Sequence, residues 1–199
     1  MAKGNLTELD AVNRALVAVN QTPLSSLGQG THALGAVAEI ILDEVVQEVQ
    51  AEGWWFNTEY SVTYTPNSSN EIELGDDVLA ADGSSATSNY IKRGNRLYDL
   101  DNHTKTFTSD VELDVIKHLD WADLPLLCKA YMAARVASRI MESYDRDTGA
   151  VRNAQGREEL ARQKMLQEDT KQADANMLTD DPTVVTSLSG SRGVLEGRA

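Results

Sequence analysis

Carboxylates are the commonest side chains in this chain that could do chemistry. The 199 residues include 31 Asp and Glu against 18 Lys and Arg, for a net charge of −13. Glu71, Glu73, Asp76 and Asp77 cluster on a predicted strand and the loop after it. Two carboxylates at the right separation can hydrolyse a glycoside. With so many acids some pair meets that criterion by chance, so ordinary surface acids are the favoured interpretation.

A cation site would need ligands at regular spacing. Asp110, Glu112 and Asp114 alternate along a predicted strand and would share one face. An EF-hand also needs Gly at position six and Glu at position twelve, which are absent here, so a solvated strand face is favoured over a calcium site. The zinc-binding residue types are His32, His103, His118 and Cys128. Their spacing matches no zinc motif.

The standard catalytic motifs are also missing from the sequence. It contains no P-loop, no dinucleotide-binding glycine motif, no serine-hydrolase elbow and no zinc-peptidase helix. We therefore expect no catalytic residue, no cofactor and no bound metal. The remaining cluster is Trp54-Trp55-Phe56. It is interpreted as a core plug that joins the helical and β-rich parts. The alternative is a platform for stacking a ligand or for a subunit interface, which one tryptophan would reach.

Four segments have the periodicity of amphipathic helices. They are residues 7–20, 31–52, 120–144 and about 150–177. Thr7 and Asp10 resemble a capping box at the first start, and Gly53 is placed to end the second helix. The fourth segment is poor in apolar residues, which indicates a helix that is solvated or rests on partners.

The helix at residues 120–144 is expected to be the centre of a bundle. Asp123 is a candidate cap, and Pro125 fits the first turn. Its apolar stripe includes Leu127 and Tyr144, and its alanines allow a neighbouring helix to approach closely. Leu126→Asp is accordingly expected to damage folding.

Residues 57–119 change to a period of two. Tyr60, Val62 and Tyr64 are expected on one face of a strand, and residues 75–88 are expected to be mostly loop. Gly94-Asn95 predicts a two-residue hairpin turn of type II′. Strands in this region predict a small antiparallel sheet.

Together these patterns predict an α+β fold, a bundle of about four helices with an inserted sheet. Residues 1–56 and 120–178 would form the bundle, residues 57–119 the β-rich insertion, and residues 179–199 a flexible tail. No apolar run is long enough to span a membrane, and the first ten residues lack the apolar core of a signal peptide. The single cysteine excludes an internal disulfide. The acidity argues against tight DNA binding.

Four stretches in order resemble one protein family. They are ELDAVNRALVAVNQTPLSSL, EGWWFNTEY, RGNRLYDL and DLPLLCKAYMAARVASRI. Their order and spacing are similar to the tail tubular protein A family of T7-like podoviruses, the head-to-tail adaptor or gatekeeper ring. The resemblance covers residues 6–178.

The resemblance implies a structural virion protein, made in the host cytoplasm and assembled into the phage tail. It implies a dodecameric ring docked beneath the portal protein, with the tail tubular protein B nozzle on its other side. Double-stranded DNA would pass through the lumen without specific binding during ejection. We expect acids of residues 155–181 to face that lumen, because repulsion keeps DNA mobile. The resemblance implies no cofactor and no catalytic residue.

Two alternatives stay open at the level of sequence. The first is a tail-associated hydrolase of polysaccharide or peptidoglycan, which release of reducing ends would reveal. The second is a helical interaction module of a host cell, which co-migration with portal rings would argue against.

Overall fold

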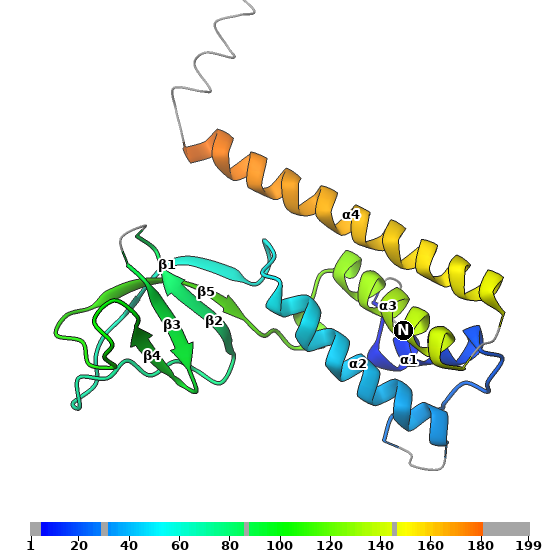
Figure 1. Ribbon diagram of the computed structural model, residues 1–199. Helices are drawn as coiled ribbons and strands as arrows, with labels where there is room; N and C mark the ends of the chain where they lie inside the picture. The colour runs from blue at the N-terminus through cyan, green and yellow to red at the C-terminus, as the bar shows by residue number, and fades with distance from the viewer. Residues whose placement is uncertain (1–4, 29–31, 86–87, 145–146, 181–199) are drawn as a thin grey trace, which may run out of the picture.

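The computed structural model describes residues 5–28, 32–85, 88–144 and 147–180 and has the predicted α+β class (Figure 1). Its α-helices are α1 (Glu8–Ala18), α2 (Ala33–Ala51), α3 (Leu126–Tyr144) and α4 (Thr148–Asp180), with a 3₁₀ turn at Trp121–Asp123. Its strands are β1 (Thr58–Tyr64), β2 (Val78–Gly83), β3 (Tyr90–Arg93), β4 (Arg96–Asp99) and β5 (Val111–Lys117). Most of the predicted tail, residues 181–199, lies outside the described residues.

The ends of the first two helices follow the predicted capping chemistry. Thr7 Oγ1 accepts a 3.1 Å hydrogen bond from the Asp10 backbone N–H, and the Asp10 carboxylate accepts one of 3.0 Å from Thr7 N–H. This confirms the capping box. Gly53 follows α2 with φ of +74°, the left-handed conformation that a residue with a Cβ rarely adopts.

The start of α3 differs from the prediction, which had the helix begin at residue 120 and Asp123 cap it. Residues 121–123 instead form a separate 3₁₀ turn, and α3 begins after Pro125. Leu124 has extended backbone angles, φ −67° and ψ 143°. A residue before proline is excluded from the helical region by contact with the proline ring. Pro125 therefore divides the predicted helix in two.

The helices enclose the larger hydrophobic core, with α3 in contact with the other three. Tyr131, Met132, Val136 and Ile140 of α3 are fully buried. The predicted position of its apolar stripe was partly wrong. Leu127 and Tyr144, the predicted ends of the stripe, are exposed to solvent, and so is the neighbouring Leu126. Leu126→Asp therefore acts on a surface position, and the expectation that it damages folding is withdrawn.

The β-rich part holds two antiparallel sheets. The larger has the order β1-β5-β2, and the smaller is the β3–β4 hairpin. The hairpin prediction is confirmed, since Arg93 pairs with Arg96 across the turn and Gly94 has φ of +60°. The prediction of mostly loop at residues 75–88 was wrong over β2, which pairs with β5.

A bulge interrupts β1 and breaks the predicted alternation. The register against β5 shifts between Glu59 and Val62, and Ser61 has φ of +52°. The Asp114 carboxylate of β5 accepts a hydrogen bond of 2.9 Å from the Ser61 N–H within this bulge. The extra residue sends Tyr60 outward, 73% exposed, while Val62 packs against the buried side chains of the sheet.

The sheets have their own hydrophobic core. Its buried members are Ile72, Leu74, Val78, Ala81, Leu97, Phe107, Leu113 and Val115. None of these side chains belongs to the core between the helices. The described residues thus form a helical part and a β part, each with a separate cluster of buried apolar side chains. They are joined where α2 passes into β1 and where the chain returns from β5 toward α3 (Figure 1).

Candidate interaction surfaces

The structure separates the side chains that the sequence suggested for metal binding. Among the described residues no group of three or more His, Cys, Asp or Glu is placed to hold a metal ion. His32 caps α2 by accepting the Gly35 N–H at 2.9 Å. His103 lies in a turn with positive φ, and His118 follows β5. Cys128 is buried in α3, and burial raises the pKa of its thiol to about 12.

The three alternating acids near β5 are also not gathered into a cation site. Asp110 precedes the strand and Glu112 is exposed on it. Asp114 already accepts hydrogen bonds from Ser61 N–H at 2.9 Å and from Ser84 Oγ at 2.5 Å. Its oxygens therefore hold the β1 bulge and the end of β2 in place.

Glu71 is the most enclosed of the acids considered for glycoside hydrolysis. Its carboxylate is paired with Arg96 and, at 2.8 Å, with Lys105 Nζ. The Lys105 hydrogen bond and the charges of both basic groups hold the pKa of Glu71 below its usual value. A glycosidase general acid needs the opposite, a pKa raised enough to keep its proton near neutral pH. Glu71 therefore fits a structural ion pair that ties β4 to the preceding segment.

Glu71→Gln should reduce stability at neutral pH and should make stability less sensitive to acid. The folded-state pKa lies below the usual 4.5, so the ion pairs stabilise the fold above that pH. Their contribution is lost as the pH falls through the lower, folded-state value. Thermal melts between pH 7 and pH 3 should show the two curves converging. Glu73→Gln, two residues along and exposed, is the matched control and should run parallel to the wild type.

The aromatic cluster lies at the junction between the two parts, as predicted. Trp54 is buried, and its indole N–H donates to the Val49 carbonyl oxygen at 2.6 Å. Trp55 and Phe56 are half buried, with ring centroids 5.1 Å apart in an edge-to-face arrangement. The backbone N–H of Trp55 donates to Asp169 of α4 at 2.9 Å. The backbone of the cluster is thus tied to α4 of the same chain, and the rings of Trp55 and Phe56 pack against the helical core.

Two buried amides complete this junction, and the sequence analysis missed both. Gln50 bonds both backbone groups of Leu119, at 2.7 and 3.1 Å. Asn57 accepts from Trp54 N–H and donates to the carbonyls of Gln50 and Lys117, each at 2.8 Å. The two side chains join the end of α2 to the chain where it leaves β5.

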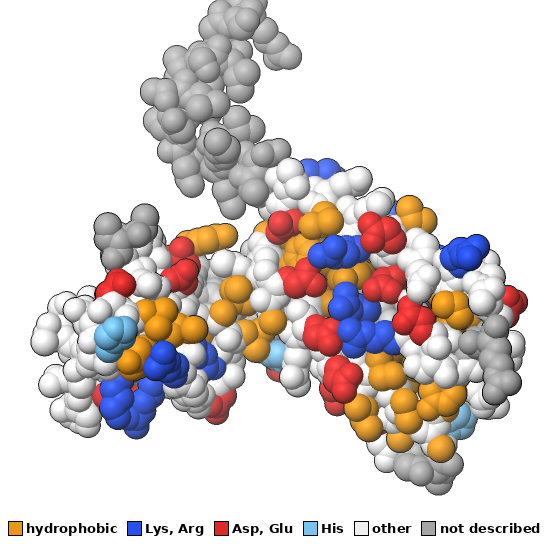
Figure 2. Space-filling model, in the orientation of Figure 1, with side chains coloured by type: hydrophobic (Ala, Val, Ile, Leu, Met, Phe, Trp, Pro, Cys, Tyr) orange, Lys and Arg blue, Asp and Glu red, His pale blue; other side chains and the backbone are white. Residues whose placement is uncertain are grey.

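A layer of charged side chains fixes α4 over α2 and α3. Arg135 of α3 bonds Glu48 of α2 at 3.0 Å and lies 3.9 Å from Glu158 of α4. Arg162 of α4 bonds Glu52 at 3.1 Å. Figure 2 shows this layer as interleaved blue and red side chains across the helical part. Together with Met165 of α4, whose side chain is fully buried in the helical core, this layer attaches a helix with few apolar residues to the bundle.

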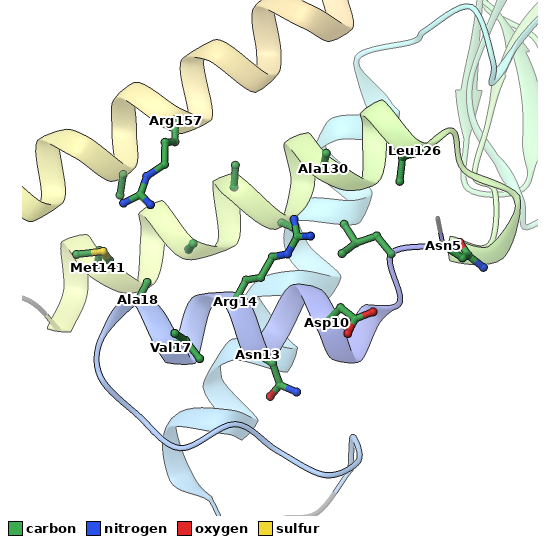
Figure 3. Close-up of a pocket in the computed structure, with 15 residues that line it drawn as sticks. Asn5, Asp10, Asn13, Arg14, Val17, Ala18, Leu126, Ala130, Met141 and Arg157 are labelled. Carbon is green, nitrogen blue, oxygen red and sulfur yellow. The ribbon is translucent and has the colours of Figure 1, made fainter. Parts of the chain in front are cut away.

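A groove of about 890 Å³ lies between α1, α3 and α4. Its floor is made of small α3 side chains, including Ala130, Ala134 and Ala137. Val17 of α1 and Leu126 of α3 are exposed in its walls, by 55% and 54%. Figure 3 shows Arg14 and Arg157 reaching toward the space between the helices. An apolar, alanine-lined groove of this kind suits a protein segment better than a reaction site.

Comparison with known proteins identifies the family. A family model described as tail tubular protein matches residues 9–184, which include nearly the whole of every helix and strand described above. The chain belongs to the tail tubular protein family. The resemblance noted in the sequence is thereby confirmed at the level of the family, and this member is a structural protein of a phage tail.

One relative of this tail protein is tail tubular protein A of Klebsiella phage KP34. It is 29% identical over 120 residues, which cover 60% of this chain and 63% of the relative. The match therefore spans less than two thirds of the relative's length. No described helix has the length and apolar content needed to cross a membrane.

Proposed function

We propose that this tail protein is the ring adaptor between the portal protein and the tail nozzle of a short-tailed phage. The observation that carries the proposal is the family match over residues 9–184, which extends across both the helical part and the β part. In the proposed assembly the chain is present as a dodecamer, with the portal on one side and tail tubular protein B on the other. The virion tail is then its working location.

The two parts suit separate tasks in such a ring. We propose that residues 1–56 and 120–178 form one domain and residues 57–119 a second, inserted one. Two clusters of buried side chains without a shared member support this division. The helical domain would pack side by side with its neighbours, and the β domain would extend toward one of the docked partners.

Genomic double-stranded DNA would pass through the ring without specific binding. The net charge of −13 supports this, because repulsion between the ring and phosphate prevents adhesion. The expectation that acids of α4 line the lumen receives less support. Of its described acidic side chains, Glu158 and Glu168 lie in ion pairs, while Glu159 and Asp169 accept hydrogen bonds from this chain.

Electron microscopy of the purified chain mixed with purified portal rings tests the proposal. We expect an additional ring of density on one end of the portal, with twelve-fold symmetry. The chain alone is expected to be a monomer or small oligomer, because a portal can template the ring. Portal particles unchanged by an excess of the chain would refute the adaptor role.

A further inference from the structure

Two arginines of the groove, Arg14 and Arg157, make no ion pair with the described residues, although the chain has an excess of acids. Arg157 Nε donates to the Asn153 carbonyl oxygen of its own helix at 3.3 Å. The basic side chains of the neighbouring charged layer, Arg135, Arg139 and Arg162, are all paired. Asp10 also lines the groove, but its carboxylate is held in the capping box by Thr7. The groove therefore combines an apolar floor with two arginines outside ion pairs and one acid that is already engaged.

A second apolar surface lies on α2. Its outer face, defined as Ala33, Ala36, Val37 and Ile40, follows the spacing of a single helix face. Ile40 is 59% exposed, although the same helix buries Leu42 and Val45 on its other side. Figure 2 shows hydrophobic side chains gathered over this end of the helical part.

The outer face of α2 is followed by negative charge. Asp43 is exposed one turn after Ile40 and makes no ion pair with the described residues. Glu44, its neighbour, reaches Arg139 only at 4.0 Å. The apolar outer face of α2 is complementary to the alanine floor of the groove. The unpaired acid that follows this face is complementary in charge to the unpaired arginines of the groove.

The groove and the outer face of α2 lie on opposite sides of the bundle. Ala137 is in the groove floor, whereas Arg139, two residues later, bonds Glu48 of α2. Two residues correspond to about 200° around an α-helix, so α3 stands between the two surfaces. Surfaces that differ and point in opposite directions form head-to-tail contacts, which close into rings when repeated with a suitable rotation.

We infer that the groove between α1, α3 and α4 binds the outer face of α2 of a second copy of this chain. The inference rests on the proposed ring and names the surfaces that build it. Ile40 of one copy enters the groove near Val17 of the next, and Arg14 and Arg157 meet the acids that follow Ile40.

Cross-linking in assembled particles tests this contact. Chains carrying Ile40→Cys and Val17→Cys together, purified as phage particles and treated with a short bismaleimide, should give a ladder of dimers, trimers and higher species. Either single variant should stay monomeric. The wild type is the control for Cys128, which is fully buried. Both substituted side chains are exposed, and thermal melts of the purified variants check that each still folds.

The outcomes separate the interface from the adaptor role. Particles that lack the wild-type chain on immunoblotting would refute the proposed function. Particles that contain the doubly substituted chain but give no ladder would overturn the interface alone. Cross-linked dimers from Ile40→Cys alone would also overturn it, since they require two α2 faces to meet.

A charge reversal provides an independent arm. Arg157→Glu should reduce the copies of the chain per particle by about tenfold, because it places like charges across the contact. Arg152→Glu, also exposed on α4 but outside the groove lining, is the matched control and should be incorporated normally. Equal incorporation of both variants would contradict the proposed pairing.

Discussion

Asn57→Ala is expected to lower the free energy of unfolding by about 3–5 kcal/mol. The Asn57 side chain makes three hydrogen bonds of 2.8 Å, to Trp54 N–H and to the carbonyls of Gln50 and Lys117. The residue is 2% exposed, so water cannot replace the amide without opening the junction. Alanine leaves one buried donor without its partner and removes a hydrogen bond from two carbonyls.

Urea unfolding followed by circular dichroism measures this loss. Asn153→Ala provides the matched control, because Asn153 is exposed on α4 and alanine is favourable in a helix. It should change stability by no more than about 0.5 kcal/mol. A loss below about 1 kcal/mol for Asn57→Ala would show that the junction relaxes and that its hydrogen bonds are replaced by water.

Tyr131→Ala is expected to cost about 3–5 kcal/mol, which is the range for removing a buried aromatic ring. Tyr131 is fully buried in the core between the helices. It lies on α3, the helix that contacts the other three, so the cavity would open at the centre of the bundle. Whole-domain stabilities are usually only about 5–15 kcal/mol, so this variant is expected to unfold at much lower urea concentration.

Tyr131→Phe isolates the hydroxyl from the ring. The hydroxyl accepts a 2.8 Å hydrogen bond from Arg135 Nη1, next to the charged layer. Losing it should cost about 1 kcal/mol. If the two variants were equally stable in urea, the ring would contribute little and α3 would not be the packing centre of the bundle.

Periodicity was enough to place the helices because it reports local spacing. The four helical segments, the Thr7 capping box and the Gly53 helix end were all predicted from neighbouring residues. The exposure of the two ends of α3 was not predicted. A stripe at helical spacing shows which side chains share a face, but the length of the neighbouring helices decides how much of that face is covered.

Features that depend on distant partners could not be predicted. The β2 sequence has two alanines and ends in glycine, a weak strand signal, and it forms a strand because it pairs with β5. Gln50 bonds a residue 69 positions later, and Asn57 bonds one 60 positions later. Polar residues at such separations have no local pattern that reveals them, so the junction became visible only in the fold.

The sequence indicated one feature of the groove. The alanines of residues 130–137 indicated close approach of another helix. In the fold all four of these alanines line the groove, but Ala133 is buried, while Ala130, Ala134 and Ala137 are partly exposed. The sequence could not show which alanines would be buried and which exposed, because that depends on how α1 and α4 are placed over α3.

The amide junction has a consequence for how such chains can evolve. Asn57 and Lys117 are hydrogen bonded backbone to backbone as well as through the Asn57 side chain, so the chain leaves and re-enters the helical part at one point. The residues between Asn57 and Lys117 form a segment whose two ends lie side by side. Deleting this segment would leave two adjacent chain ends. In the ring proposed above, this module could therefore change in length or sequence to fit a different nozzle, while the proposed contacts between copies stay unaltered.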